Sequence, residues 1–121
     1  MYEYRAQVLR VIDGDTVEIL LDQGLKEYRR MSLRLFGINA PELRTPEGPP
    51  ARQHLSDLLG KIPATAVVRT IKDAADKYGE RWDGNLWLES DGLWTPEFAF
   101  ATTTPSLNQR MVTDGYAVVY P

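Results

Sequence analysis

The clearest indication of the fold comes from residues 8–36, VLRVIDGDTVEILLDQGLKEYRRMSLRLF. Apolar, β-branched runs at 8–12 and 16–21 predict two strands, separated by Asp13-Gly14. Asp-Gly favours a two-residue type I′ hairpin, in which both central positions take a positive φ. After a second turn at 22–24, residues 27–36 read as a third strand, long enough to bend around a small barrel. The stretch therefore predicts a meander of three antiparallel strands.

A loop and a helix are expected next. Residues 37–50 are rich in Gly and Pro and have no periodicity, which predicts a loop. Apolar residues then recur at helical spacing over 51–59. Pro50 suits the first helical turn, and Gly60 suits the end of the helix.

The remainder adds two strands and a second helix. Residues 64–71 and 85–88 predict strands on either side of a polar turn at 76–84. Ser106 and Gln109 match a capping box, and Gly115 suits the left-handed position after a short helix; residues 116–120 predict an extended end. The order βββ-α-ββ-α predicts a mainly β (α+β) fold, a five-stranded OB-fold barrel with two appended helices. With no repeat or linker, residues 1–121 are expected to form a single domain.

The amino-acid composition limits which metal ligands and catalytic groups the chain can offer. The 121 residues include no cysteine, which excludes disulfides, thiolate metal sites and cysteine nucleophiles. The single histidine, His54, is expected on a half-buried or exposed helix face. A bound metal would therefore depend on oxygen ligands, which favours calcium or magnesium.

The net charge and the hydropathy of the chain limit the kinds of partner that we expect it to bind. The net charge of −3 argues mildly against a high-affinity, salt-driven nucleic-acid binder. However, 13 of the 14 Lys and Arg residues lie within 1–81, so the sequence leaves room for a basic face there. No apolar run approaches the roughly 20 residues that cross a bilayer, and the first residues lack the apolar stretch of a signal peptide. We expect a soluble, cytoplasmic protein with no membrane partner, unless a leader has been removed.

Polar residues gather in two places along the first strands. Asp13 and Asp15 flank a glycine at the predicted hairpin tip, where a solvated turn is the alternative interpretation. Arg34 lies near the end of the third strand, and Asn39 and Glu42 follow in the loop. Taken singly, an arginine on a strand is usually solvated or ion-paired. Together these residues offer oxygen ligands for a hard cation, a base and a phosphate clamp.

A third polar cluster covers residues 76–82. Its Lys77, Tyr78 and Arg81 could hold a phosphate and stack a base, or simply form a charged hairpin. Trp87 and Trp94 are expected to pack against the barrel rather than to bind bases.

In this order, the three clusters resemble the thermonuclease (staphylococcal-nuclease-like) family, and the resemblance covers nearly the whole chain. The blocks that carry it are residues 11–17, 33–42, 76–79, 107–112 and 115–117. It implies a calcium-dependent endonuclease that hydrolyses phosphodiester bonds of DNA and RNA with little sequence specificity and leaves 3′-phosphates. Its partner would be the nucleic acid substrate, with no obligate protein partner.

The resemblance also implies roles for individual residues. Calcium would be held by Asp15, Asn39 and the Ala40 carbonyl, with Asp13 close behind. The catalytic residues would be Glu42 as general base and two arginines on the phosphate, Arg34 and Arg81. The residues that line the nucleotide site would be Lys77 and Tyr78.

Two departures from the family pattern bear on these roles. Asn39 stands where an aspartate is usual, so calcium is expected to bind more weakly. Glu80 follows Gly79 where the second arginine usually stands, and a one-residue insertion in the turn would pass that role to Arg81. A turn can absorb an extra residue, whereas a strand cannot, because its side chains would exchange faces.

Two other functions remain open from the sequence. A non-catalytic module of the same fold would bind nucleic acid or protein, and Asn39, Glu80 and the acidic balance favour it. A purely structural barrel would present the acidic segment after Trp82 to a protein partner. The retention of Asp15, Arg34 and Glu42 together favours the enzyme.

Overall fold

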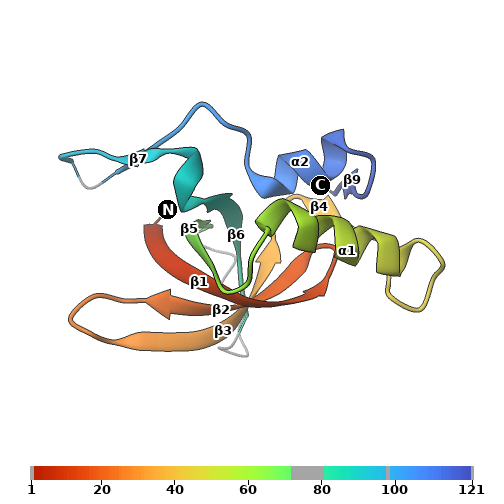
Figure 1. Cartoon of the computed structure of the whole chain (residues 1–121), viewed down its shortest axis with the longest axis horizontal. Coiled ribbons are helices and arrows are strands. Elements are labelled where there is room, and N and C mark those ends of the chain that lie inside the picture. Colours follow the sequence, from red (N-terminus) through yellow and green to blue (C-terminus); the bar gives the residue numbers. More distant parts are fainter. Residues whose placement is uncertain (1, 72–80, 98, 121) are drawn as a thin grey trace.

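The computed structural model describes residues 2–71, 81–97 and 99–120. Its main body is a closed barrel in the order β1-β2-β3-β6-β5 (Figure 1). The barrel strands are β1 (Tyr2–Asp13), β2 (Thr16–Asp22), β3 (Tyr28–Leu35), β5 (Ala64–Thr70) and β6 (Arg81–Leu88). Neighbouring strands pair antiparallel except β3 and β6, which pair in parallel. The predicted five-stranded, OB-like barrel is confirmed.

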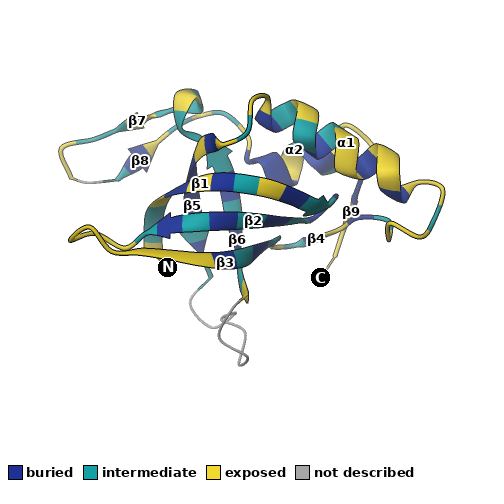
Figure 2. Ribbon diagram, turned by 60° about the horizontal axis from the view of Figure 1, so that its bottom comes forward, coloured by how far each residue is buried: buried dark blue, intermediate teal, exposed yellow. Residues whose placement is uncertain are grey.

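Two helices and two small sheets complete the described structure. The helices are α1 (Gly48–Leu59) and α2 (Leu107–Thr113), with a 3-10 turn at Glu89–Asp91. The small sheets pair β4 (Ile38–Asn39) with β9 (Val118–Val119), and β7 (Leu93–Trp94) with β8 (Phe100–Ala101). Both helices lie at one end of the barrel, and the β2–β3 hairpin tip lies at the other (Figures 1 and 2). None of the described helices is long and apolar enough to cross a membrane.

Buried and less buried residues alternate along β2 and along the second half of β3, and the ribbon colours of Figure 2 show this alternation for β2. The inward residues of these two strands are all buried: Val17, Ile19, Leu21, Met31, Leu33 and Leu35. In β1 the alternation changes, because the pairing register shifts between Val8 and Arg10. This bulge lets Val8 and Val11 both face the core, three positions apart.

The helices cover one end of this core through apolar faces. Leu55 of α1 and Met111 of α2 are fully buried. The predicted cap of α2 is confirmed, since Ser106 Oγ accepts a hydrogen bond from the Gln109 backbone N–H at 3.2 Å. The predicted left-handed position is also confirmed, with a φ of 86° at Gly115.

The type I′ turn predicted at Asp13-Gly14 is wrong. The turn residues are Gly14 and Asp15, and neither has a positive φ. Glycine is needed here because there is no room for a side chain, and not because of its φ. A Cβ on Gly14 would lie 2.7 Å from the Cβ of Ala40 and 2.9 Å from that of Ala51. The close approach packs the turn against the loop after β4 and the side of α1.

Other boundaries also differ from prediction. The loop predicted over 37–50 contains β4, and α1 begins at Gly48 rather than Pro50. β6 begins at Arg81, so residues 81–84 of the predicted polar turn belong to a strand. β7 and β8 were not predicted. Residues 72–80, with Lys77, Tyr78 and Glu80, lie outside the described structure.

Candidate functional site

The turn between β1 and β2 places Asp15 against the loop after β4. Asp15 is buried, and its Oδ2 accepts a hydrogen bond from the Ala40 backbone N–H at 2.9 Å. Oδ1 accepts one from the Thr16 hydroxyl at 3.0 Å, and Arg34 Nη2 lies 3.7 Å from Oδ2. These donors offset part of the cost of burying the charge.

A second carboxylate lies immediately behind Asp15. Asp13 Oδ1 accepts a hydrogen bond from the Asp15 backbone N–H at 3.0 Å. Burial, followed by the hydrogen bonding and negative charge of Asp15, raises the pKa of Asp13 above its usual 3.8. The turn therefore concentrates negative charge where β1 and β2 meet.

Arg34 faces this acidic turn from β3. Its backbone pairs with Thr16 of β2, which sets its position relative to Asp15. The guanidinium Nη2 also donates to the Ile38 carbonyl at 3.1 Å and lies 3.4 Å from Asn39 Oδ1. Its side chain is only 19% exposed, so little of the charge is screened by water.

The predicted calcium ligands partly converge. Asn39 and Ala40 follow each other at the end of β4; Arg34 contacts Asn39, and Asp15 contacts Ala40. The described residues contain no group of three or more His, Cys, Asp or Glu side chains that could hold a metal ion. The predicted ligand atoms are nevertheless all oxygens, and a hard cation such as calcium prefers oxygen ligands.

Glu42 is oriented differently. Its side chain is 66% exposed and forms an ion pair with Arg44, two residues along the same loop. Its backbone carbonyl accepts hydrogen bonds from the N–H and hydroxyl of Thr45. In this conformation the carboxylate is directed to Arg44, and the predicted base is not joined to Asp15 or Arg34 by a hydrogen bond or ion pair.

Arg81 lies on the same outer face of the barrel as Arg34. The parallel pairing of β3 with β6 sets Arg81 opposite Ser32 and Asp83 opposite Arg34, and paired residues in a ladder share a face. The two arginines are therefore diagonal neighbours on adjacent strands. Tyr78 and Lys77 lie outside the described residues.

Asn108 is a positioning residue that the sequence did not single out. It is buried on α2, and its Nδ2 donates to the carbonyls of Phe36 at 2.9 Å and Gly84 at 3.1 Å. Its Oδ1 accepts from the Leu86 backbone N–H at 3.1 Å. This one amide ties α2 to the end of β3, just beyond Arg34, and to the middle of β6. The available signal in the sequence was a polar residue at helical spacing from the apolar Met111, three positions later.

Tyr120 adds an aromatic neighbour to Arg34. The guanidinium carbon lies 5.7 Å from the centre of the Tyr120 ring. The Tyr120 backbone N–H donates to the Gly37 carbonyl at 2.8 Å, which holds the end of the described chain beside β4. Trp87 packs as predicted, since its ring contacts Phe100 and its Nε1 donates to the Thr104 carbonyl.

Comparison with known proteins gives two related sequences. No protein-family model matches the chain. It is 35% identical over 119 residues to Protein ParB of Escherichia coli, a match that covers 98% of this chain and 58% of that protein. It is 32% identical over 118 residues to a micrococcal nuclease of Shigella flexneri, covering 98% of this chain and 59% of that protein. Each match covers almost the whole of this chain, but the chain spans less than two thirds of the length of either relative.

Proposed function

We propose that this chain is a calcium-dependent endonuclease that hydrolyses phosphodiester bonds of DNA and RNA with little sequence specificity, leaving 3′-phosphates. The observation that carries the proposal is the convergence of Asp15, Arg34 and Asn39, in which a buried carboxylate, a guanidinium and an amide oxygen meet at one end of the barrel. The similarity to a micrococcal nuclease supports the same chemistry.

The residues fit a cation with an incomplete protein shell. Asp15, Asn39 and the Ala40 carbonyl would hold calcium, with Asp13 adding negative charge behind them. The remaining ligands would come from water and the substrate phosphate, because calcium takes six to eight oxygens. Bound there, the ion would offset charge on the phosphate oxygens as the reaction proceeds.

The arginines would act on the phosphate directly. Arg34 and Arg81 would donate to its oxygens, where negative charge accumulates in the transition state. Water attacks phosphorus, the bond to the 5′-oxygen breaks, and that oxygen leaves with the electron pair and takes up a proton. Lys77 and Tyr78 would contact the nucleotide.

Glu42 would accept the proton of the attacking water. For this the carboxylate has to turn from Arg44 towards the cluster. Both side chains of that ion pair are mostly exposed, and exposed pairs contribute about 0–1 kcal/mol, so the rearrangement costs little.

The alternative function is a non-catalytic module that binds nucleic acid or protein. The outward orientation of Glu42 and the replacement of an acidic ligand by Asn39 favour it. Such a module would still use Arg34 and Arg81 for phosphates but would bind equally well with or without a metal.

Cleavage of single-stranded DNA by the purified protein, with calcium, with magnesium and with a chelator, separates the two. The enzyme is expected to cut only with calcium and to leave 3′-phosphates. A folded protein that binds the strand but leaves it intact under all three conditions supports the binding module.

A further inference from the structure

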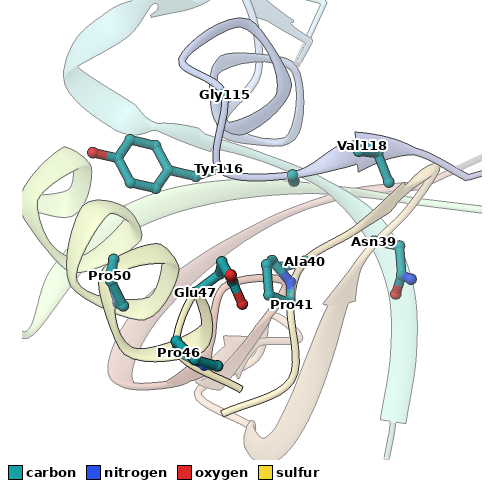
Figure 3. Close-up of a pocket in the computed structure, with 10 residues that line it drawn as sticks. Asn39, Ala40, Pro41, Pro46, Glu47, Pro50, Gly115, Tyr116 and Val118 are labelled. Atoms are coloured by element: carbon teal, nitrogen blue, oxygen red, sulfur yellow. The ribbon is translucent and has the colours of Figure 1, made fainter. Parts of the chain in front are cut away.

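A pocket of about 540 Å³ adjoins the candidate site (Figure 3). It lies between the loop after β4, the start of α1 and the segment that follows α2. Its lining residues are Asn39, Ala40, Pro41, Pro46, Glu47, Pro50, Gly115, Tyr116, Ala117 and Val118. The structure does not describe Lys77 and Tyr78, the predicted nucleotide residues, so only the described lining residues are considered below.

The walls are mostly apolar and held in place. Three prolines line the pocket, and proline rings lose little conformational freedom when a ligand binds. The Tyr116 ring stacks on His54 at 4.1 Å and 15° between planes, and His54 Nε2 lies 2.7 Å from Asp114 Oδ2. A preformed apolar cavity of this size suits a planar aromatic ligand.

The position of the pocket beside Arg34 indicates which kind of aromatic ligand it would bind. Asn39 belongs both to the pocket lining and to the cluster around Arg34, whose Nη2 lies 3.4 Å from its Oδ1. In Figure 3, Asn39 lies at one end of the pocket, and Tyr116 and Pro50 lie toward the other. A nucleotide whose phosphate contacts Arg34 therefore has the pocket within reach of its own base.

Glu47, an exposed residue at the start of α1, supplies the charged group among the described residues that line the pocket. Its carboxylate has no hydrogen-bond or ion-pair partner among the residues that the structure describes, and it carries the same charge as a phosphate. Such a group favours a ligand that presents N–H donors. Guanine offers two adjacent donors, N1–H and the 2-amino group, which match the two oxygens of a carboxylate, whereas adenine has an acceptor at N1.

We infer that the pocket binds the base of the nucleotide whose phosphate contacts Arg34, and that Glu47 favours guanine there. The inference rests on the proposed function for the position of the phosphate. It adds a preference for one base, at one nucleotide position, to a nuclease activity that is otherwise proposed to have little sequence specificity.

Nucleotide binding tests the inference without requiring cleavage. The whole chain would be titrated, with calcium present, with 5′-GMP, 5′-AMP and ribose 5-phosphate while amide NMR shifts are followed. GMP is expected to bind about tenfold more tightly than ribose 5-phosphate, because its base would leave water for the mostly apolar walls of the pocket. The shifts should include Ala40, Tyr116 and Val118. Equal affinities for GMP and ribose 5-phosphate would overturn the inference.

Two pairs of variants locate the base. Val118→Trp fills the pocket, while Val119→Trp adds the same bulk to the next residue of β9, which is exposed but does not line the pocket. Only Val118→Trp should abolish the advantage of GMP over ribose 5-phosphate. Glu47→Gln should remove the preference for GMP over AMP, and Glu27→Gln, an equal charge change in the β2–β3 turn, should keep it. Equal behaviour within either pair contradicts the corresponding contact.

Cleavage data separate this inference from the proposed function. If the protein cuts DNA but GMP binds no better than ribose 5-phosphate, the nuclease stands and the base pocket fails. If no metal supports cutting and GMP still binds in the pocket, the nuclease fails and the base pocket stands.

Discussion

At the scale of single residues, the candidate site depends on how the Arg34 guanidinium is held. A carboxylate, a backbone carbonyl and a side-chain amide lie around one of its nitrogens, and the Tyr120 ring lies beside it. A planar, forked cation can keep such contacts and still donate to a phosphate. An ammonium group has a single nitrogen and cannot do both in the same geometry.

Arg34→Lys is therefore expected to lower kcat/KM for single-stranded DNA by about 10²-fold, although the charge is conserved. The measurement is initial cleavage rates against substrate concentration, with circular dichroism to confirm the fold. Arg29→Lys, on the same strand, is the matched control and should keep most of the activity. Full activity in Arg34→Lys would remove this arginine from the mechanism.

Asn39 tests the proposed cation site. Asn39→Asp restores a negative ligand, and calcium should bind about tenfold more tightly, because ligand charge tunes calcium affinity. Calorimetric titration of calcium measures the change. Asn85→Asp on β6 adds the same charge outside the cluster and should have little effect. An unchanged titration of Asn39→Asp would show that this position is not a ligand.

Asn108 makes a third prediction, on stability. Asn108→Leu keeps the approximate size of the side chain but leaves a backbone N–H and two carbonyls without their amide partner. We expect a loss of about 2–4 kcal/mol in the free energy of unfolding. Urea denaturation measures it, and Gln109→Leu, an exposed change on the same helix, should cost much less. Similar losses in both variants would contradict a bridging role for Asn108.

At the scale of elements, the parallel pairing of β3 with β6 determines where the arginines lie. Ser32 pairs with Arg81, and Arg34 pairs with Asp83. A shift of one residue in β6 would turn Arg81 towards the barrel interior and Trp82 outward, because side chains alternate along a strand. The inserted residue inferred from the sequence must therefore be absorbed before Arg81, where the strand begins.

This register predicts opposite effects for two neighbouring substitutions. Arg81→Ala should reduce cleavage by about 10²-fold, since it removes a phosphate donor. Glu80→Ala should leave cleavage unchanged or raise it, because it removes an acid next to Arg81 in the sequence. Initial cleavage rates of the two variants, measured side by side, test whether Arg81 is the second phosphate-binding arginine. Loss of cleavage in Glu80→Ala alone would overturn the assignment of Arg81.

At the scale of the whole molecule, stability should depend on the acidic turn. Asp13 has a raised pKa in the folded protein, so its ionised form is less favourable there than in the unfolded chain. The cost is fully present above the folded-state pKa and disappears as the pH falls below the usual value of 3.8. Asn at this position keeps an acceptor for the Asp15 N–H without the charge.

Asp13→Asn should therefore raise the melting temperature at pH 7, and the difference from the original protein should vanish near pH 3. Thermal unfolding followed by circular dichroism across this range is the measurement. Asp57→Asn on the exposed face of α1 serves as the control. A difference between Asp13→Asn and the original protein that stays constant with pH would contradict the electrostatic explanation.

Much of the fold could be predicted because local patterns and the final structure agree. The alternation of apolar residues along β2 and β3 survives in the barrel, and Ser106 and Gly115 act at the ends of α2 as expected. The site is predictable only in part. The meeting of Asp15, Arg34 and Asn39 follows from the strand order, whereas the orientation of Glu42 depends on its exposed neighbour Arg44.

The amino-acid sequence was enough to predict the succession of barrel strands and helices along the chain, the cap of α2 and the residue types available for chemistry, because these depend on side-chain periodicity and local backbone preferences. The folded structure was needed to explain why Gly14 is a glycine, what Asn108 bridges and where the pocket beside Asn39 opens. Each of these depends on segments far apart in the chain coming within a few ångströms of one another. Such contacts leave no periodic signal in a single sequence, since packing between elements, rather than local preference, selects the residues.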